Sequence, residues 1–464
     1  MLVKQEVEQT QSGEILQWTI LIFALCLTTI FQRHLFLGKF GWFLLVLLGA
    51  IKSDYAVYAA FFYGALFHAS GFFPDLFFTV KHFHIAISLL TAILFLKSEL
   101  WIKVKANYKS SFILLIPWIL IILISTIATV VNSQDQIIRG LRTNANILTL
   151  LLSSFILICV IDRKRMIINA LLAYAFGVTI RLILAGLSFK LGEQFFYSDY
   201  EYLFYNNHIG FLCASAVFIL FSFIVISKPE LKASHYIISS FLLVTTFTGL
   251  LLSCSRTGWF AFVFVSVMFG YFFNLMRKSQ HTRDAAVSRS VLVIMALSFA
   301  LIVEIGIFMN QDVFSRITSL DRFFDPTYLW FVINERTNFG PFGIFRLNQF
   351  YSVREILSRN YLIGVGLVKV VTDFHSLYLT LLGGTGILGF ALFFRFAIQW
   401  SRKLLDRLSR FDDGTNLIRL GIFSAFLVWL LYSFMESFVV QFNIWIVLTV
   451  GTILCDRTRV ERMS

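Results

Sequence analysis

The stretch His375–Phe394 reads HSLYLTLLGGTGILGFALFF and is the part of the chain that most clearly decides its fold class. Behind two polar residues it is an almost unbroken apolar run, and about 20 such residues cross a bilayer as a helix. His375 and Ser376 stand at the start of the run, where a membrane helix would meet water. Imidazole changes its charge near neutral pH, so we expect a functional role for it. Three glycines follow at a spacing of three residues: Gly383, Gly386 and Gly389.

These glycines predict a face on which a neighbouring helix packs closely. Gly386 lies eleven residues after His375, which is close to three turns of a continuous helix. We therefore expect Gly386 to lie beneath His375, where the packed neighbour would fix the position of the imidazole ring. Asp373 is near enough in sequence to orient that ring. The alternative is an interfacial histidine whose ring is satisfied by a backbone carbonyl.

The composition excludes a water-soluble protein. Apolar residues make up 58% of the chain and charged residues 14%, whereas about 25% charge is typical of soluble chains. There are only five prolines, so most helices should be uninterrupted. A transmembrane β-barrel would show alternating segments of about ten residues, which are not visible. The five cysteines form no C-x-x-C pair and read as small buried hydrophobic residues. We expect an all-α, polytopic integral membrane protein with 12–14 transmembrane helices.

Fourteen apolar runs are candidate membrane spans. The second and the sixth are short, which leaves twelve spans as an alternative. The first is an uncleaved anchor, because no small-residue cleavage site follows it. The runs begin near Ile15, Leu35, Tyr55, Phe83, Ser111, Ile147, Met166, His208, His235, Arg256, Ser290, His375, Ile418 and Ser437.

The distribution of lysine and arginine gives the orientation, since cytoplasmic loops carry an excess of these residues. With both termini inside and fourteen alternating helices, the inside receives 24 of the 39 cations. The net charge of +13 therefore mostly reflects topology, and nothing in it indicates a nucleic-acid partner. We expect about eleven spans in residues 1–309, a large extracytoplasmic loop at 310–374 and about three spans in 375–464.

The long loop carries seven cations, which suggests an anionic ligand such as phosphate or diphosphate. Arg346 is one of them, although a solvated loop arginine is the alternative reading. Gly340–Gly343 is a turn signal, and Gln349–Asn360 reads as a short amphipathic helix.

Two further arginines are candidates for binding an anion. Arg256 follows Ser253-Cys254-Ser255 at the expected start of a helix, where free backbone amides favour an anion; the alternative is an arginine that snorkels to the interface. Arg181 lies inside the span that begins near Met166. An arginine there costs at least about 2.5–3.5 kcal/mol and is usually kept for function. Its alternative is a buried ion pair with Glu304 or Glu436.

At these residues the chain resembles the O-antigen ligase and polymerase superfamily of bacterial inner-membrane glycosyltransferases. One pattern in the chain is similar to the ligase motif of that family: a histidine and a serine, then nine residues, a glycine, two residues and a second glycine. The matching positions are His375, Ser376, Gly386 and Gly389. The Ser-Arg-Thr-Gly at 255–258 is similar to the family's arginine at the outer start of a helix. Arg346 and the Leu-Ile-Gly-Val-Gly at 362–366 resemble the segment that leads to the motif.

The resemblance implies transfer of a glycan from undecaprenyl diphosphate to a sugar hydroxyl at the periplasmic face of the inner membrane. His375 would be the general base, and Arg256 and Arg346 would bind the diphosphate. The acceptor would be lipid A–core or a second lipid-linked repeat. Inversion at the anomeric carbon is expected, without a metal or another cofactor.

Two alternatives to an O-antigen ligase stay open. A polymerase that joins lipid-linked repeats is favoured by fourteen spans and by Arg181 followed by Gly192, which is similar to an arginine-x10-glycine pattern of some polymerases. A flippase of lipid-linked oligosaccharides would also have many spans and buried arginines. It should show charged residues along several helices and two related halves, which are not visible.

Overall fold

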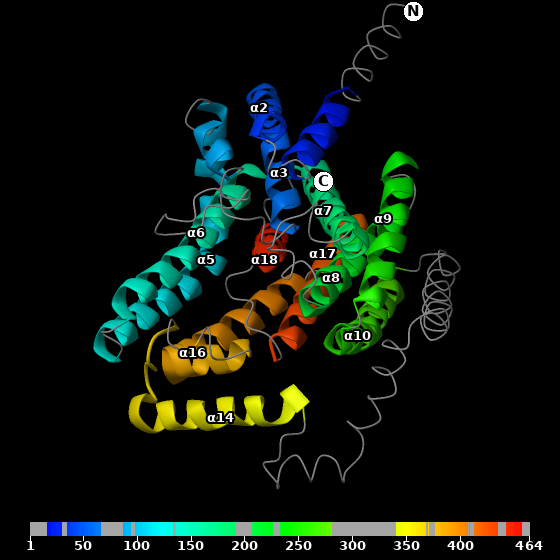
Figure 1. Ribbon diagram of the computed structural model, residues 1–464. Coiled ribbons are helices and arrows are strands. Elements are labelled where there is room, and N and C mark those ends of the chain that lie inside the picture. Colours follow the sequence, from blue (N-terminus) through cyan, green and yellow to red (C-terminus); the bar gives the residue numbers. More distant parts are fainter. Residues whose placement is uncertain are drawn as a thin grey trace, which may run out of the picture.

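The computed structural model describes residues 16–29, 35–65, 87–93, 98–132, 136–191, 206–225, 233–253, 255–280, 340–367, 370, 376–406, 408, 413–434 and 442–456. Within these ranges every regular element is a helix (Figure 1). Besides helices at Leu16–Thr29 and 87–93, the described helices are α2 (Leu35–Ile51), α3 (Asp54–Ala65), α5 (Ser98–Asn132), α6 (Ile137–Val160), α7 (Lys164–Leu191), α8 (Asn206–Val225), α9 (Ala233–Leu252), α10 (Arg256–Gln280), α14 (Gly340–Asn360), α16 (Leu377–Leu405), α17 (Asp413–Tyr432) and α18 (Phe442–Cys455).

The described helices match the expected spans closely. Thirteen of the fourteen runs coincide with a helix, and the one near Ser290 lies outside the described residues. The second span is short, as expected, but the expectation of a short sixth span is wrong, because α6 has 24 residues. The expected turn at Gly340–Gly343 is also wrong. Those residues form the first turn of α14, where Pro341 is well tolerated because the first helical amides have no partner within the helix.

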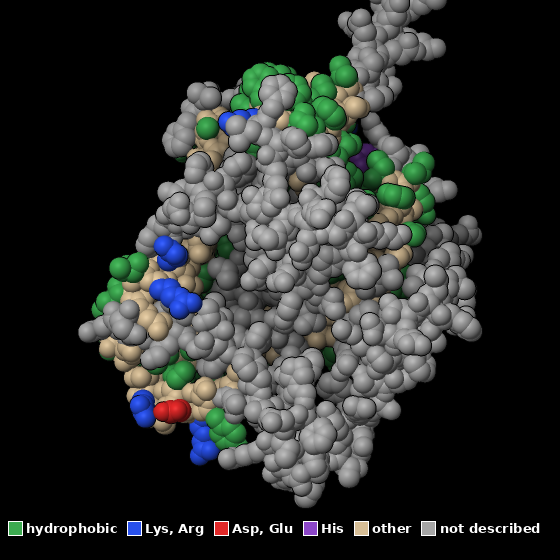
Figure 2. All heavy atoms as spheres, in the orientation of Figure 1, with side chains coloured by type: hydrophobic (Ala, Val, Ile, Leu, Met, Phe, Trp, Pro, Cys, Tyr) green, Lys and Arg blue, Asp and Glu red, His purple; other side chains and the backbone are tan. Residues whose placement is uncertain are grey.

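The outer surface of the bundle is apolar in the manner of a membrane protein. Six of the described helices are long and apolar enough to cross a bilayer: α5, α6, α7, α10, α16 and α17. On α5 the exposed side chains recur every three or four residues, at Ile116, Ile119, Leu123, Ile127 and Val130. Figure 2 shows further hydrophobic side chains on the outside over α2 and α9. Such stripes would aggregate in water, so the chain is a multi-pass membrane protein.

An aromatic core joins α5, α16, α17 and α18. Trp118 of α5 lies with its ring centre 5.0 Å from that of Trp445 and 6.0 Å from that of Phe393. Phe393 of α16 in turn contacts Trp429 of α17 at 5.7 Å. Aromatic pairs at these distances add to the burial of their large surfaces. These four helices are therefore held together along their middle, and α17 is almost wholly enclosed.

Ion pairs connect the helix ends that the charge distribution assigns to the cytoplasm. Arg163, between α6 and α7, contacts Asp54 at the start of α3 at 3.0 Å. Lys103 of α5 contacts Asp162 at 2.9 Å. The buried Arg419 of α17 donates from Nε and Nη2 to the carbonyl of Leu454, at 3.2 and 3.0 Å, and so caps the end of α18. The two ion pairs thus join the ends of α3, α5, α6 and α7 that lie on the same side of the bundle.

Candidate functional site

The helix that carries the glycine motif is broken in its first half. Gly386 has φ +62° and ψ −164° inside α16, a backbone conformation that is essentially restricted to glycine. In a continuous helix the amides of Ile387 and Leu388 would donate to the carbonyls of Gly383 and Gly384. They cannot do so here, and these four backbone groups need other partners within a mainly apolar bundle.

A loop supplies those partners. The amides of Val365 and Gly366 donate to the carbonyls of Gly383 and Gly384, at 3.0 and 2.8 Å. In return, the amides of Ile387 and Leu388 donate to the carbonyls of Tyr361 and Leu362, at 2.9 and 3.2 Å. The segment 361–366, which joins α14 to the region before α16, thus replaces the missing part of the helical turn. We call this arrangement the interlock.

Glycine is required on both sides of the interlock. Gly364 and Gly366 have φ values of +69° and +93°, which side chains rarely tolerate. A Cβ at Gly386 would overlap the carbonyl of Leu362, and one at Gly384 would lie 2.9 Å from the Cα of Leu367. The close approach of two backbones therefore explains Gly386 of the motif and the neighbouring Gly384.

Polar side chains of α5 hold the loop from the other side. Asn132 Nδ2 donates to the carbonyl of Gly364 at 2.9 Å, and the amide of Leu367 donates to Ser125 Oγ at 3.1 Å. Ser125 in turn donates to Asn144 Oδ1 of α6 at 3.1 Å. The loop is thus clamped between α16 and the outer ends of α5 and α6.

The expectation of a glycine face on a continuous helix is therefore wrong in its geometry. The close approach predicted from the glycines is present, but the neighbour is the 361–366 loop and not a helix. Because the backbone breaks at Gly386, the helical phase does not continue from there to Gly389. His375, from which the three turns were counted, lies outside the described residues. Gly389 lies one turn after the break, and a Cβ there would overlap the side chain of Thr385.

The start of α16 is fixed by the end of α17. The amide of Leu377 and the hydroxyl of Ser376 both donate to the carbonyl of Ser433, at 2.9 and 3.2 Å. Ser376 is buried, and its carbonyl accepts the amide and the hydroxyl of Thr380. The serine of the motif is thus a structural residue at the helix entrance, directly after His375.

The start of α10 meets the same end of α17. Ser255 caps α10, since its hydroxyl accepts the amide of Gly258 at 3.1 Å, and it also contacts Tyr432 Oη at 3.1 Å. Glycine is needed at 258 because a Cβ would overlap the Tyr432 hydroxyl. Gly210 of α8 packs on the same group, since a Cβ there would lie 2.6 Å from Oη. Tyr432, the last residue of α17, and the next residue, Ser433, therefore connect the entrances of α10 and α16.

The four candidate side chains are described to different extents. His375 lies outside the described residues, as does Asp373. Arg256 is the first residue of α10 and Arg346 lies in α14, but only their backbones are described. Arg181 is fully described and is 1% exposed on α7. Glu304 and Glu436, its suggested partners, lie outside the described residues.

Arg181 lies in a different environment from the helix entrances. Its neighbour Leu182 packs on Gly249 of α9, and Cys213 of α8 is near both. The arginine is therefore enclosed by α7, α8 and α9.

Helix α14 carries the region of Arg346 across the start of α16 (Figure 1). Val353 of α14 and Leu379 of α16 belong to one small apolar cluster, together with Val365 and Val370. The other face of α14 exposes Arg354, Glu355 and Arg359. Figure 2 shows basic and acidic side chains over α14 at the lower edge of the molecule. Two exposed cations, besides the arginine at 346, thus belong to the helix that covers the entrance.

Several residues that build this region were not predicted from the sequence. Tyr432, Ser433 and Asn132 are polar residues at the ends of apolar spans, and that position was the only available signal. Gly364 and Gly366 stood out only through the family resemblance.

The arrangement suits an anionic ligand. The start of a helix favours negative charge through its free amides and its dipole, and the first residue of α10 is an arginine. None of the known family profiles matches this chain, and no curated protein is similar to it in sequence.

The interlock makes a prediction about stability. Gly386→Ala should lower the unfolding temperature in detergent, because a side chain at this φ costs about 1–2 kcal/mol and its Cβ meets the Leu362 carbonyl. Gly270→Ala is the matched control, since a Cβ there meets no atom within 4 Å in the middle of α10. The control should be neutral or gain up to about 1 kcal/mol. Equal unfolding temperatures for the two variants would contradict the interlock.

Proposed function

We propose that this chain is a membrane glycosyltransferase of the O-antigen ligase type. It moves a glycan from undecaprenyl diphosphate to a sugar hydroxyl of lipid A–core at the periplasmic face of the inner membrane. The reaction inverts the anomeric carbon and needs no metal. His375 is the general base, and Arg256 and Arg346 bind the diphosphate, with Arg181 as a further candidate.

One observation carries most of this proposal. Ser255 and Ser376, which directly adjoin Arg256 and His375, are bonded to the consecutive residues Tyr432 and Ser433. The two motifs are about 120 residues apart in the sequence, yet their helices start at one end of the bundle. A base and an anion-binding arginine need this proximity to act on one substrate.

The chemistry follows from the roles of these residues. The acceptor oxygen attacks the anomeric carbon, and the bond from that carbon to the diphosphate oxygen breaks. The diphosphate leaves with the electron pair, and the hydroxyl proton passes to His375. Fixed arginines stabilise the negative charge that develops on the diphosphate. A positioned base contributes typically about 10²–10⁴-fold to such a step.

The rigid surroundings of the helix entrance favour an enzyme over a flippase. A transporter alternates its access by moving one set of helices against another around the bound substrate. Here the start of α16 is bonded to α17, and the broken turn of α16 is bonded to the 361–366 loop and through it to α5. Such a scaffold suits catalysis, which requires fixed groups.

Substitution of the base gives the first test. His375→Ala should lower glycan transfer by about 10²–10⁴-fold while the protein stays folded and inserted. His235→Ala is the control, because His235 lies in α9 and bonds to Asn169 at 3.1 Å, remote from the motif. Transfer is read on a gel of cell-surface polysaccharide. Normal polysaccharide in the His375 variant would rule out its role as the base.

The same gel distinguishes the loss of a ligase activity from the loss of a polymerase activity. Loss of a ligase leaves bare lipid A–core while lipid-linked polymer accumulates. Loss of a polymerase leaves single repeats attached to lipid A–core. The proposed ligase activity requires the first pattern.

The arginine at the start of α10 gives a second test. Arg256→Lys keeps the charge but removes the planar fork that binds two phosphate oxygens. Loss of one charge-assisted bond of about 1.5–3 kcal/mol should reduce transfer roughly 10–100-fold. Arg402→Lys, at an exposed position near the far end of α16, should have no effect. Full activity of the Arg256 variant would contradict diphosphate binding by this residue.

A further inference from the structure

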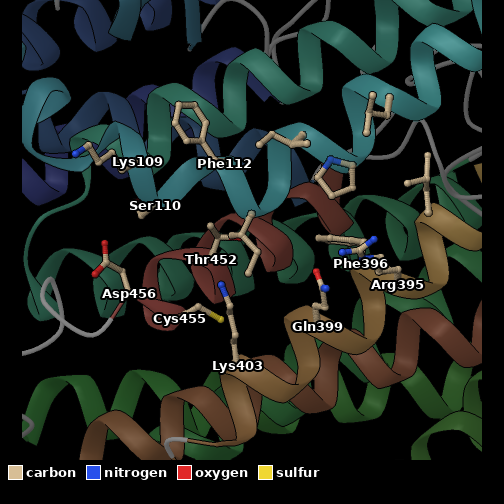
Figure 3. A pocket seen from close by; sticks show the side chains of 15 residues that line it. Lys109, Ser110, Phe112, Arg395, Phe396, Gln399, Lys403, Thr452, Cys455 and Asp456 are labelled. Carbon is tan, nitrogen blue, oxygen red and sulfur yellow. The ribbon is translucent and has the colours of Figure 1, made fainter.

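A cavity of about 750 Å³ lies between α5, α16 and α18 (Figure 3). Its walls come from the middle of α5, the second half of α16 and the end of α18. It therefore lies toward the opposite end of the helices that hold the interlock, at the end that the charge distribution assigns to the cytoplasm. The proposed transfer reaction makes no use of it.

Polar residues line one side of the cavity. Arg395, Gln399 and Lys403 recur at intervals of four on α16, and hence on one face. Figure 3 shows Gln399 and Lys403 pointing from α16 into the space beside α5. Lys109 of α5 adds a third cation and Asp456 adds one carboxylate, so the lining has a net formal charge of +2.

The three cations are available to a ligand. Within the part of the chain that the structure describes, no ion pair includes Lys109, Arg395 or Lys403. All three side chains are exposed. Arg395 and Lys403 line the hollow from one face of α16, so this side of it can hold an anion.

The opposite side of the cavity is apolar and continuous with the membrane-facing surface. Phe112, Ile116 and Leu120 line it from α5, and each is more than 40% exposed on the outside of the bundle. Pro117 of α5 also belongs to this wall. A ligand in the cavity would thus meet cations at one part and the hydrocarbon region of the bilayer at another.

We propose that this cavity binds an anionic phospholipid. The phosphate of the headgroup lies beside Arg395 and Lys403 of α16, and the acyl chains run along the apolar residues of α5. A guanidinium and an ammonium group suit phosphate oxygens, and basic pockets between transmembrane helices bind anionic headgroups. The volume falls within the range of about 300–1,000 Å³ for ligand sites. Such a lipid would join α5 to α16, the helices that clamp the 361–366 loop.

The test uses the full-length protein, purified in a neutral detergent and titrated with phosphatidylglycerol while bound lipid is counted by native mass spectrometry. The wild type should retain phosphatidylglycerol in preference to zwitterionic phosphatidylcholine. Arg395→Gln with Lys403→Gln should weaken this binding at least tenfold. The control variant, Lys105→Gln with Arg402→Gln, removes the same charge from exposed positions outside the cavity and should stay within twofold of the wild type.

Three results would overturn the proposal. One is an equal loss of binding in the two double variants, which would indicate attraction to general surface charge. Another is equal retention of phosphatidylcholine. The third is displacement of phosphatidylglycerol by an equal concentration of inorganic phosphate, which would make the ligand a free anion. Equal unfolding temperatures of the two double variants verify that they differ in lipid binding and not in stability. Lys403→Arg keeps the positive charge and should therefore retain the lipid.

Discussion

The exchange of four backbone hydrogen bonds at Gly386 is the interaction on which the outer half of this bundle depends. A broken helix in an apolar environment leaves amides and carbonyls without partners, and each costs several kcal/mol if buried unsatisfied. The 361–366 loop removes that cost by bonding to both sides of the break. Because the loop follows α14 directly and is held by α5, the break also fixes α14 across the start of α16.

The end of α17 holds the starts of two other helices in place. Its residues Tyr432 and Ser433 reach the starts of α10 and α16, and the helix itself is enclosed by its neighbours. The outer ends of three helices are thereby set relative to one another by direct hydrogen bonds. A glycosyl transfer between two bulky lipid-linked or lipid-anchored substrates needs such a fixed set of groups at the membrane surface, because only preorganised charges stabilise the leaving diphosphate without reorganisation. The proposed function rests on this rigidity and on the nature of the residues beside it.

The sequence predicted the helical membrane fold well, because hydropathy and charge act on whole segments. Contacts such as Arg163 with Asp54 and Ser433 with Ser376 join helix ends that the charge distribution places on the same side. The orientation of the chain in the membrane stays a prediction. The length of α6 was underestimated, since Arg139 and Arg142 make its first two turns polar while its backbone is still helical. The break at Gly386 was missed because a 3.6-residue period assumes continuous hydrogen bonding. The partners Tyr432, Ser433 and Asn132 lie far from the motif in sequence, so nothing local could have identified them.

Hydrogen exchange of the 361–367 segment tests the interlock most directly. Gly364, Val365 and Gly366 lie outside a regular helix. Each of their amides, and that of Leu367, donates a hydrogen bond, in three cases to a partner on α16 or α5. In the full-length protein in detergent, a peptide that covers these residues should exchange as slowly as one from the middle of α16. Exchange of this peptide within seconds, at the rate of an exposed loop, would contradict the interlock and with it the account of how the outer ends of these helices are held.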